Sequence, residues 1–471
     1  MHKAPLLPSL LLLFAASTAP TGAGAQPPSQ PQPAAASPLS LPPPPTVNDP
    51  MLAPVPPPKR ILSSWQEAVT GLRARSTDLR IAVDQVLQAE AQTRIALAAY
   101  LPTINGTATY THQLLTNAIP VTGAVGLSAS SQRVPIPDTL TGYLQAQQSL
   151  INVQTFDQIS INELGVDAAK LSVEDEKRTL SLSMANQIVA VVTAERAAEI
   201  NRVGLKVALE QLEITRRKQA LGAANGLDVV RADQNAANAR ATLVTGDESL
   251  REAREALGLA LGIPEETGVA PDVNVNGLAE STLSSCRPVQ RIDDRADIAA
   301  ARTKVDVAKR NLRNVYYQFL PSLSAQSTLF ANSNPVVGYP NPTWNIQGIL
   351  SVPIWDGGAR NGQLRSARAA EDTAAQQLEA LRRQAVIQVE QAQRQLIVAE
   401  TSDRVARGQR DLASQNDQMT QTAYMAGQGT SLELVTASEA HRQAELNLAL
   451  KDFGVVQARI LAVLALATCP W

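Results

Sequence analysis

The chain has 471 residues, a formal net charge of −2 at pH 7 and only 3% aromatic residues. The length allows one large domain or several small ones, and the near-neutral charge gives no electrostatic argument for binding nucleic acid or an anionic membrane surface. The low aromatic content favours long helices over a compact, aromatic-filled core.

The N-terminus has the pattern of a secretory signal peptide over residues 1–25. An apolar stretch from Leu6 to Ala16 follows Lys3, and Ala23-Gly24-Ala25 forms a small-x-small cleavage pattern. The stretch is shorter than the about 20 residues that a transmembrane helix needs, so we expect export. Residues 26–59 are rich in proline and alanine and are expected to form a disordered leader without a chemical role.

Four long stretches without proline predict long helices, because a proline within a helix costs about 3 kcal/mol. These stretches are 59–101, 138–263, 289–320 and 354–469. In the last of them, small and apolar residues recur every seven positions, which predicts a coiled-coil seam. The seam consists of Leu378, Ala385, Ala392 and Ala399.

The shorter segments between these helices alternate in polarity. In residues 103–111 every odd position is polar and every even position is apolar or glycine, and residues 344–348 alternate in the same way. One such strand would fit a soluble sheet, but several in an exported, helix-rich chain indicate strands between lipid and water. We predict barrel strands at about 103–115, 140–154, 321–332 and 343–354.

The chain repeats itself with an offset of 205 residues, from Gly222 to Gly427. Each copy is expected to run helix, strand, loop, strand and long helical hairpin. Repeat 1 covers 60–262, an inter-repeat linker covers 263–293, and repeat 2 covers 294–468. A unit of about 200 residues is far longer than a solenoid repeat, so we infer a duplication.

The two cysteines are candidates for a disulfide in an exported chain. Cys286 lies in the linker, and Cys469 corresponds by the repeat offset to Pro264, where the linker begins. Both thiols should therefore lie at a comparable level of the molecule. The alternative is two unpaired thiols.

Four strands cannot close a barrel, since a small closed barrel takes about eight. Unpaired strand edges are not tolerated in lipid, so the strands have to be pooled between chains. Three chains would give about twelve strands, enough for one shared pore.

At this point the residues resemble a known family. The duplicated order, the repeated glycine-to-acid phrase and the segment 352–360 are similar to the TolC family of outer-membrane efflux proteins. In that segment Asp356 can cap a helix, and two glycines permit a sharp turn from strand to helix. The residues that match this turn are Pro353, Trp355, Asp356, Gly357 and Gly358.

The resemblance implies a mostly α fold with a β-barrel. It implies a homotrimer whose twelve-stranded outer-membrane barrel continues into a periplasmic α-helical barrel. The function would be that of an outer-membrane exit duct of a tripartite efflux or secretion system, through which small molecules pass passively. Its partners would be a periplasmic adaptor protein and an inner-membrane pump, which dock at the hairpin tips.

The resemblance also implies a closing network at the tips. The family places a tyrosine three residues before the tip glycine and an acidic residue six residues after it. The matching positions are Gly222 and Asp228 in repeat 1 and Tyr424, Gly427 and Glu433 in repeat 2. Gly429 stands where the family has an arginine, and Thr436 where it has a further acid, so the salt bridges differ. The two acids fit helix caps equally well.

Catalytic and cofactor motifs are missing from the sequence. Three histidines have no ligand spacing, and there is no phosphate-binding loop or nucleophile elbow. We expect no enzyme activity, metal or cofactor. The alternatives are an exported coiled-coil structural or adaptor protein without a membrane barrel, and a type I protein-secretion duct; the alternating strands argue against the first. The cargo stays open.

Overall fold

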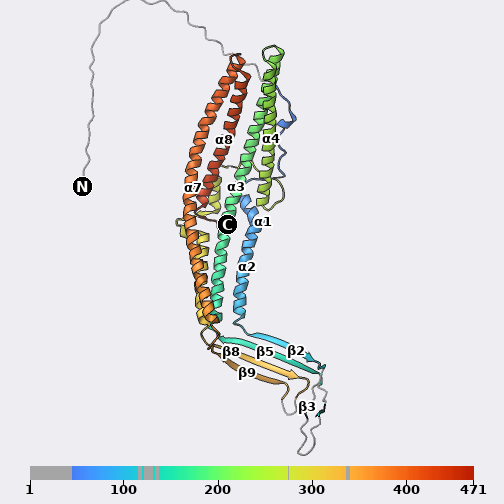
Figure 1. Ribbon diagram of the computed structural model, residues 1–471, viewed down its shortest axis with the longest axis vertical. Coiled ribbons are helices and arrows are strands. Elements are labelled where there is room, and N and C mark those ends of the chain that lie inside the picture. The colour runs from blue at the N-terminus through green and yellow to red at the C-terminus, as the bar shows by residue number, and fades with distance from the viewer. Residues whose placement is uncertain (1–44, 115–118, 121–130, 133–136, 274, 336–339) are drawn as a thin grey trace, which may run out of the picture. The chain divides into compact units, whose positions relative to one another are not determined.

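A computed structural model describes residues 45–114, 119–120, 131–132, 137–273, 275–335 and 340–471. The expected signal peptide and most of the leader lie outside these residues. Residues 46–471 form one unit. Each half of that unit contains a helix, two long strands and a long helical hairpin (Figure 1), so the predicted duplication is confirmed.

The long elements follow one another in the same order in both halves. Repeat 1 contains α2 (Thr77–Ala98), β2 (Thr103–Thr111), β5 (Thr139–Ile151), α3 (Val153–Ala220) and α4 (Gly226–Ala260), and the shorter helix α1 (Trp65–Arg75) precedes them. Repeat 2 contains α6 (Ala296–Tyr317), β8 (Ser322–Asn332), β9 (Thr343–Ser351), α7 (Ala359–Met425) and α8 (Ser431–Leu464).

Short elements complete the unit. Before α1 and between β2 and β5 lie η1 (Pro50–Leu52), β1 (Arg60–Leu62), β3 (Ile119–Pro120) and β4 (Ser131–Gln132). The linker between the repeats and the C-terminus contain β6 (Thr267–Val269), α5 (Leu278–Ser285), β7 (Arg287–Pro288), η2 (Ile292–Asp294) and β10 (Ala467–Thr468).

Helix α3 is the central helix of the unit. It begins directly after β5, because the Asn152 side chain accepts a hydrogen bond from the Thr155 backbone N–H at 3.2 Å and caps the helix. Its 68 residues rise over about 100 Å. Helices α2, α4, α6 and α8 all pack along it. Among the described residues, no helix is both long and apolar enough to cross a membrane.

Helix α7 has fewer neighbours and packs along α6 and α8. Its buried residues follow the predicted seven-residue seam, with Leu378, Ala385 and Ala392 buried and Ala399 half-buried. Small side chains at these positions allow close approach of the neighbouring helices.

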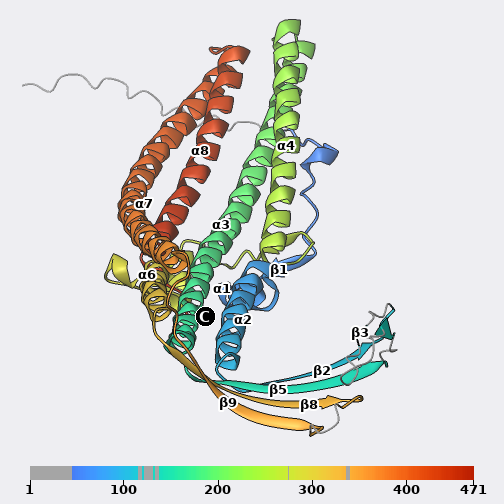
Figure 2. The same cartoon turned by 60° about the horizontal axis from the view of Figure 1, so that its bottom comes forward.

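The four long strands form one antiparallel sheet in the order β2-β5-β8-β9. Figure 2 shows them side by side in a curved sheet. Strands β2 and β9 are its two edges, and every residue of both is exposed. Both edges of the sheet are therefore free to pair with a further strand.

The register sorts the side chains of the sheet onto two faces, because side chains alternate along a strand. The apolar face includes the aligned row Gly106, Leu144, Leu329 and Trp344. The opposite face includes the aligned row Asn105, Gln145, Thr328 and Asn345. One face of the sheet is thus suited to lipid and the other to water.

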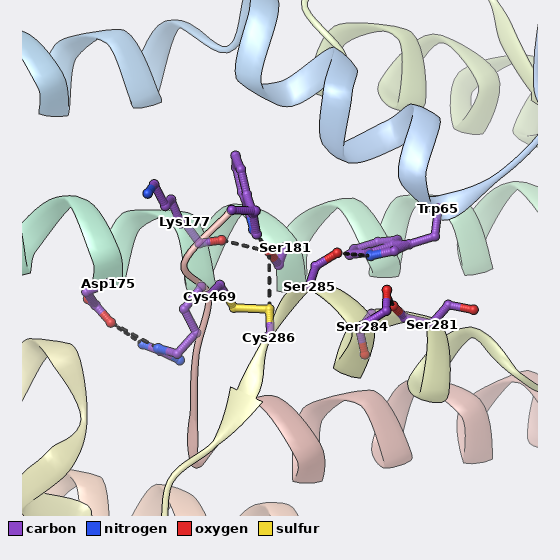
Figure 3. Close-up of a disulfide and its surroundings, with 12 residues drawn as sticks. Trp65, Asp175, Lys177, Ser181, Ser281, Ser284, Ser285, Cys286 and Cys469 are labelled. Atoms are coloured by element: carbon purple, nitrogen blue, oxygen red, sulfur yellow. Dashed lines mark hydrogen bonds and ion pairs between the residues drawn. A yellow bond between two sulfur atoms is a disulfide. The ribbon is translucent and has the colours of Figure 1, made fainter.

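The largest apolar core lies where the linker meets α1, α3 and α8. Cys286 and Cys469 are both fully buried there and form a disulfide (Figure 3). The Trp471 indole N–H donates to Ser181 Oγ at 2.9 Å. Antiparallel pairing of β7 with β10 adds to the same junction. The C-terminal end of the chain is thereby tied to the linker and to α3.

Residues 46–59 differ from the disordered leader expected from the sequence. They lie along the α3–α4 hairpin, where Val47, Met51 and Leu52 pack on its apolar cluster. Asp49 accepts two hydrogen bonds from Arg240, at 2.9 and 3.2 Å. Composition alone suggested a linker, but three apolar side chains and one paired acid fix this segment. We refer to residues 46–58 as the strap.

Candidate functional site

The two hairpin turns have the same backbone design. Gly222 and Gly427 follow the last turns of α3 and α7 with φ of 75° and 74°, a left-handed conformation that favours glycine. The Ala223 N–H donates to the Lys218 carbonyl at 2.8 Å, and the Gln428 N–H donates to the Ala423 carbonyl at 2.9 Å. Both turns therefore end their helices with a Schellman motif.

The second half of each turn is a capping box. In repeat 1, the Asn225 side chain accepts from the Asp228 N–H at 2.9 Å, and Asp228 accepts from the Asn225 N–H at 3.3 Å. Thr430 and Glu433 make the equivalent pair in repeat 2, at 3.2 and 2.8 Å. The Thr430 backbone N–H, followed by its hydroxyl, holds the pKa of Glu433 below its usual value. Both acids thus serve as helix caps.

Two contacts join the tips of the hairpins within one chain. Ser431 Oγ donates a short hydrogen bond to Asp228 Oδ1. Lys218 Nζ donates to the Tyr424 carbonyl at 2.9 Å and lies 3.7 Å from the centre of the Tyr424 ring. Burial lowers the pKa of Lys218. The sequence did not single out Lys218 or Ser431, since their repeat counterparts, Ala423 and Gly226, carry no such group.

Tyr424 and Glu433 are not brought into contact within the chain. Tyr424 is 6% exposed, and its hydroxyl has no hydrogen-bond partner among the described residues. No cation of the described part of the chain lies within 4.0 Å of the Glu433 carboxylate. At Gly429, an added Cβ would meet the Tyr424 backbone N at 3.1 Å, so this turn is packed on α7 where the family has an arginine.

Below the tips, a polar network links α3 with α7 and α8. Gln211 donates to Ser438 Oγ at 2.7 Å, and Ser438 donates to Asp417 at 2.7 Å. His441 Nδ1 lies 3.2 Å from the same Asp417 carboxylate. The adjoining cavity, between α3, α4 and α8, has a volume of about 170 Å³. No group of three or more His, Cys, Asp and Glu in the described residues is arranged to hold a metal ion.

The turn from β9 into α7 is built around Asp356. Its carboxylate accepts from the Gly358 N–H at 3.0 Å, the Arg360 N–H at 2.9 Å and Arg360 Nε at 2.7 Å. The Arg360 side chain is the first cause that lowers the pKa of Asp356 to about 2. Gly357 and Gly358 have φ of 69° and 91°. Both glycines are thus needed for this change of direction.

The other two residues of this turn have different surroundings. Pro353 accepts a hydrogen bond from Arg360 through its carbonyl, at 3.4 Å. Trp355 is 84% exposed. Repeat 1 lacks this loop, because α3 begins two residues after β5 ends.

The chain is similar to one known family, to individual relatives and to solved structures. The family described as Outer membrane efflux protein matches residues 69–263 and 288–464. The pyoverdine export outer membrane protein OpmQ of Pseudomonas aeruginosa is 25% identical over 297 residues, which are 62% of this chain and 60% of OpmQ. The chain thus spans less than two thirds of that relative.

Nodulation protein T of Rhizobium leguminosarum bv. trifolii is 24% identical over 416 residues, 84% of this chain and 83% of the relative. The crystal structure of the CmeC outer membrane channel of Campylobacter jejuni superposes with a TM-score of 0.70 and 16% identity. That superposition covers 90% of this chain and 93% of CmeC. At this identity the structural match establishes the fold.

Proposed function

The chain belongs to the outer membrane efflux protein family, and from this premise we propose that it is the outer-membrane exit duct of a tripartite efflux system. Small molecules pass through it passively, and the partner proteins supply the energy. The duct starts in the periplasm at the hairpin tips and ends in the outer membrane at the sheet. Its work is transport and not catalysis.

The open sheet carries this proposal. Four strands with the two free edges β2 and β9 leave backbone N–H and C=O groups unpaired, which is unfavourable in lipid. Edge β9 of one chain can pair with edge β2 of the next. Three copies then supply twelve strands, which is enough for one closed barrel around a shared pore.

Exposed apolar residues at the joints between strands and helices support a membrane boundary there. Apolar and aromatic side chains of this kind form girdles at the edge of the lipid. They come from both repeats and from all four joints between the long strands and their helices. They are Leu101, Phe156, Phe319, Leu320, Ile354 and Trp355, between 40% and 90% exposed.

The outer face of α7 supports contact between copies. Beside its buried seam, α7 carries apolar residues that the described part of the chain leaves exposed. They are Ile397, Val398, Val405, Leu412 and Met419, between 57% and 70% exposed. A second copy packed on α7 would bury them, and hydrophobic burial favours such a contact by about 25 cal/mol per Å².

The hairpin tips form the periplasmic entrance in this proposal. Three chains place six carboxylates there, from Asp228 and Glu433, which favours cations at the entrance. Gly222 and Gly427 shape the turns that a periplasmic adaptor and an inner-membrane pump would reach. The Tyr424 hydroxyl is buried and has no hydrogen-bond partner among the described residues, so the tip would have to rearrange before this hydroxyl could join a closing network between chains.

Electron microscopy of the protein purified from outer membranes in mild detergent tests the proposal. We expect threefold particles with a central channel and a long axis of about 130 Å, from a helical section of about 100 Å and a membrane section of about 30 Å. Globular monomers, or rods without a membrane section, would overturn the duct and favour a coiled-coil adaptor. Deleting the gene should also raise the sensitivity of the host to exported small molecules.

A further inference from the structure

The strand register brings amide side chains of all four strands together on the water-facing side of the sheet. Gln147, Gln326 and Gln347 are aligned partners on β5, β8 and β9, and Thr103 of β2 continues their row. In the next row Gln145 pairs with Asn105 and with Thr328, which pairs with Asn345. We name the six amide residues the amide band. They are Asn105, Gln145, Gln147, Gln326, Asn345 and Gln347.

An aromatic pair borders the band on the same face. Tyr143 and Phe330 are aligned partners in the following row, and their rings meet edge to face with centroids 5.3 Å apart. Thr107 and Thr343 flank them on the outer strands. The water-facing side thus offers amides, hydroxyls and one aromatic pair per chain.

Charge is missing from the whole sheet. Strands β2, β5, β8 and β9 contain no Asp, Glu, Lys, Arg or His. Lipid-facing positions exclude charge in any membrane strand, but water-facing positions do not. Polar residues without charge on that side are therefore a property of this pore wall and not a requirement of the fold.

We propose that the amide band is the surface that cargo contacts within the membrane, and that it makes this section of the duct indifferent to the charge of the cargo. The inference rests on the proposed function and adds a specificity-determining element to it. Each amide offers two donors and an acceptor, so it hydrogen-bonds cationic, anionic and neutral polar groups alike. A ring of like charges would instead favour one sign.

The cargo class follows from this wall. Small organic molecules with polar groups of either sign fit the amide band, and planar rings can also stack on Tyr143 and Phe330. Discrimination by charge is then left to the hairpin tips, where Asp228 and Glu433 are the acids. The tips and the membrane section therefore have separate roles in selectivity.

Ion permeation through the trimer in planar lipid bilayers tests this division. Reversal potentials under a KCl gradient would be measured for the wild type and for a tip-neutral variant carrying Asp228→Asn and Glu433→Gln. We expect the K⁺/Cl⁻ permeability ratio of the tip-neutral variant to fall well below that of the wild type, because the strands carry no charge that could replace the tip carboxylates, while Lys218 and Arg231 remain at the tips. A strong preference for one ion that persists in this variant would overturn the inference.

Charges placed in the band should restore selectivity in the tip-neutral background. Gln326→Glu with Gln347→Glu should raise the K⁺/Cl⁻ ratio by about fivefold, and Gln326→Lys with Gln347→Lys should invert it. Gln326→Asn with Gln347→Asn is the uncharged control and should leave the ratio of the tip-neutral background unchanged. Channels of normal conductance whose ratio ignores these charges would show that the band does not face the pore.

A second variant adds the charge only after the trimer has folded. Gln347→Cys in the tip-neutral background can be treated with negatively or positively charged methanethiosulfonate reagents. The two native cysteines are joined in the disulfide, so the introduced thiol is the one that reacts. We expect opposite shifts of the reversal potential with the two reagents, and equal potentials would overturn the inference. Failure of every variant and of the wild type to conduct would instead overturn the proposed duct.

Discussion

The hairpins α3–α4 and α7–α8 have the same turn and different surroundings. Both turns combine a left-handed glycine with a capping box, so residues close in sequence decide them. Around the turns the resemblance ends. Helix α3 is covered by four other helices, whereas α7 packs on α6 and α8 and leaves an apolar face exposed.

The strap adds to this difference. It lies on the α3–α4 hairpin, and the Arg254 guanidinium donates to the Pro56 carbonyl at 3.0 Å while it also pairs with Glu195. In the described part of the chain, the α7–α8 hairpin has no equivalent segment. The two copies of the duplicated unit have thus kept their turns and diverged in what packs on their sides. Repeat 1 is braced by its own chain, and repeat 2 leaves an apolar surface of α7 uncovered.

The disulfide lies in the apolar core to which α3 and α8, one helix of each hairpin, both contribute. Its removal should have the largest effect on stability. Cys286 and Cys469 are 183 residues apart, and the chain-entropy description assigns such a bridge about 5 kcal/mol of stability. We expect Cys286→Ser to lower the urea midpoint of helix unfolding, followed by circular dichroism, and to loosen both hairpins.

Ser285→Ala is the matched control, since it removes only the hydrogen bond from the Trp65 indole at 3.1 Å. Its midpoint should stay near that of the wild type. A reduced wild-type protein that unfolds at the same urea concentration as the oxidised one would show that the β7–β10 junction holds without the bridge.

The tip glycines test whether the two turns are equivalent. Gly222→Ala and Gly427→Ala should each destabilise the protein by about 1 kcal/mol, because alanine is disfavoured at positive φ. An added Cβ meets nothing within 4 Å at either position, so the effect is one of conformation. Unfolding midpoints would measure it, and unequal losses would mean that the turns differ.

Gly165→Ala in α3 and Gly408→Ala in α7 are the controls for the tip glycines. Both glycines lie inside helices, and an added Cβ again meets nothing within 4 Å. Alanine should therefore stabilise each helix by up to about 1 kcal/mol. The sign of the change would separate the turn positions from the helical ones.

Much of this architecture could be predicted because its signals are local. Alternation over residues 103–111 and the seam through Leu378 and Ala385 each describe one element, and the structure has the strand and the seam there. The family and the duplicated fold followed from the order of such elements and are confirmed. Asp228 and Glu433 were open between gate and cap; both form capping boxes, and a gate role stays a prediction.

The rest depends on pairs far apart in sequence. Ser431 bonds to Asp228, Lys218 lies on Tyr424, and Asp49 pairs with Arg240, and none of these pairs has a periodic signal. The short elements of the linker, such as α5, lie in a segment without a repeat counterpart. The proline-rich composition of residues 46–59 gave no signal for the three apolar side chains and the Asp49–Arg240 pair that hold the strap.

The strap gives the smallest expected effect and the sharpest contrast between the hairpins. Asp49→Ala removes a part-buried ion pair and a cap of η1, together worth about 1 kcal/mol. We expect faster hydrogen exchange in residues 47–52 and in α4 around Arg240, with α8 unchanged. Arg251→Ala is the control, since it removes an ion pair between two residues of α4 that does not involve the strap.

The same pair should make the strap sensitive to acid. The Met51 backbone N–H, and then Arg240, hold the pKa of Asp49 below its ordinary value of 3.8. The stabilisation by Asp49 is therefore complete above about pH 4 and is lost as the pH falls through the lowered pKa. Exchange in residues 47–52, corrected for the intrinsic rate, should rise below pH 3.8 in the wild type and stay flat in Asp49→Ala. A wild-type strap that keeps its protection at pH 2 would show that Val47, Met51 and Leu52 hold it without the ion pair.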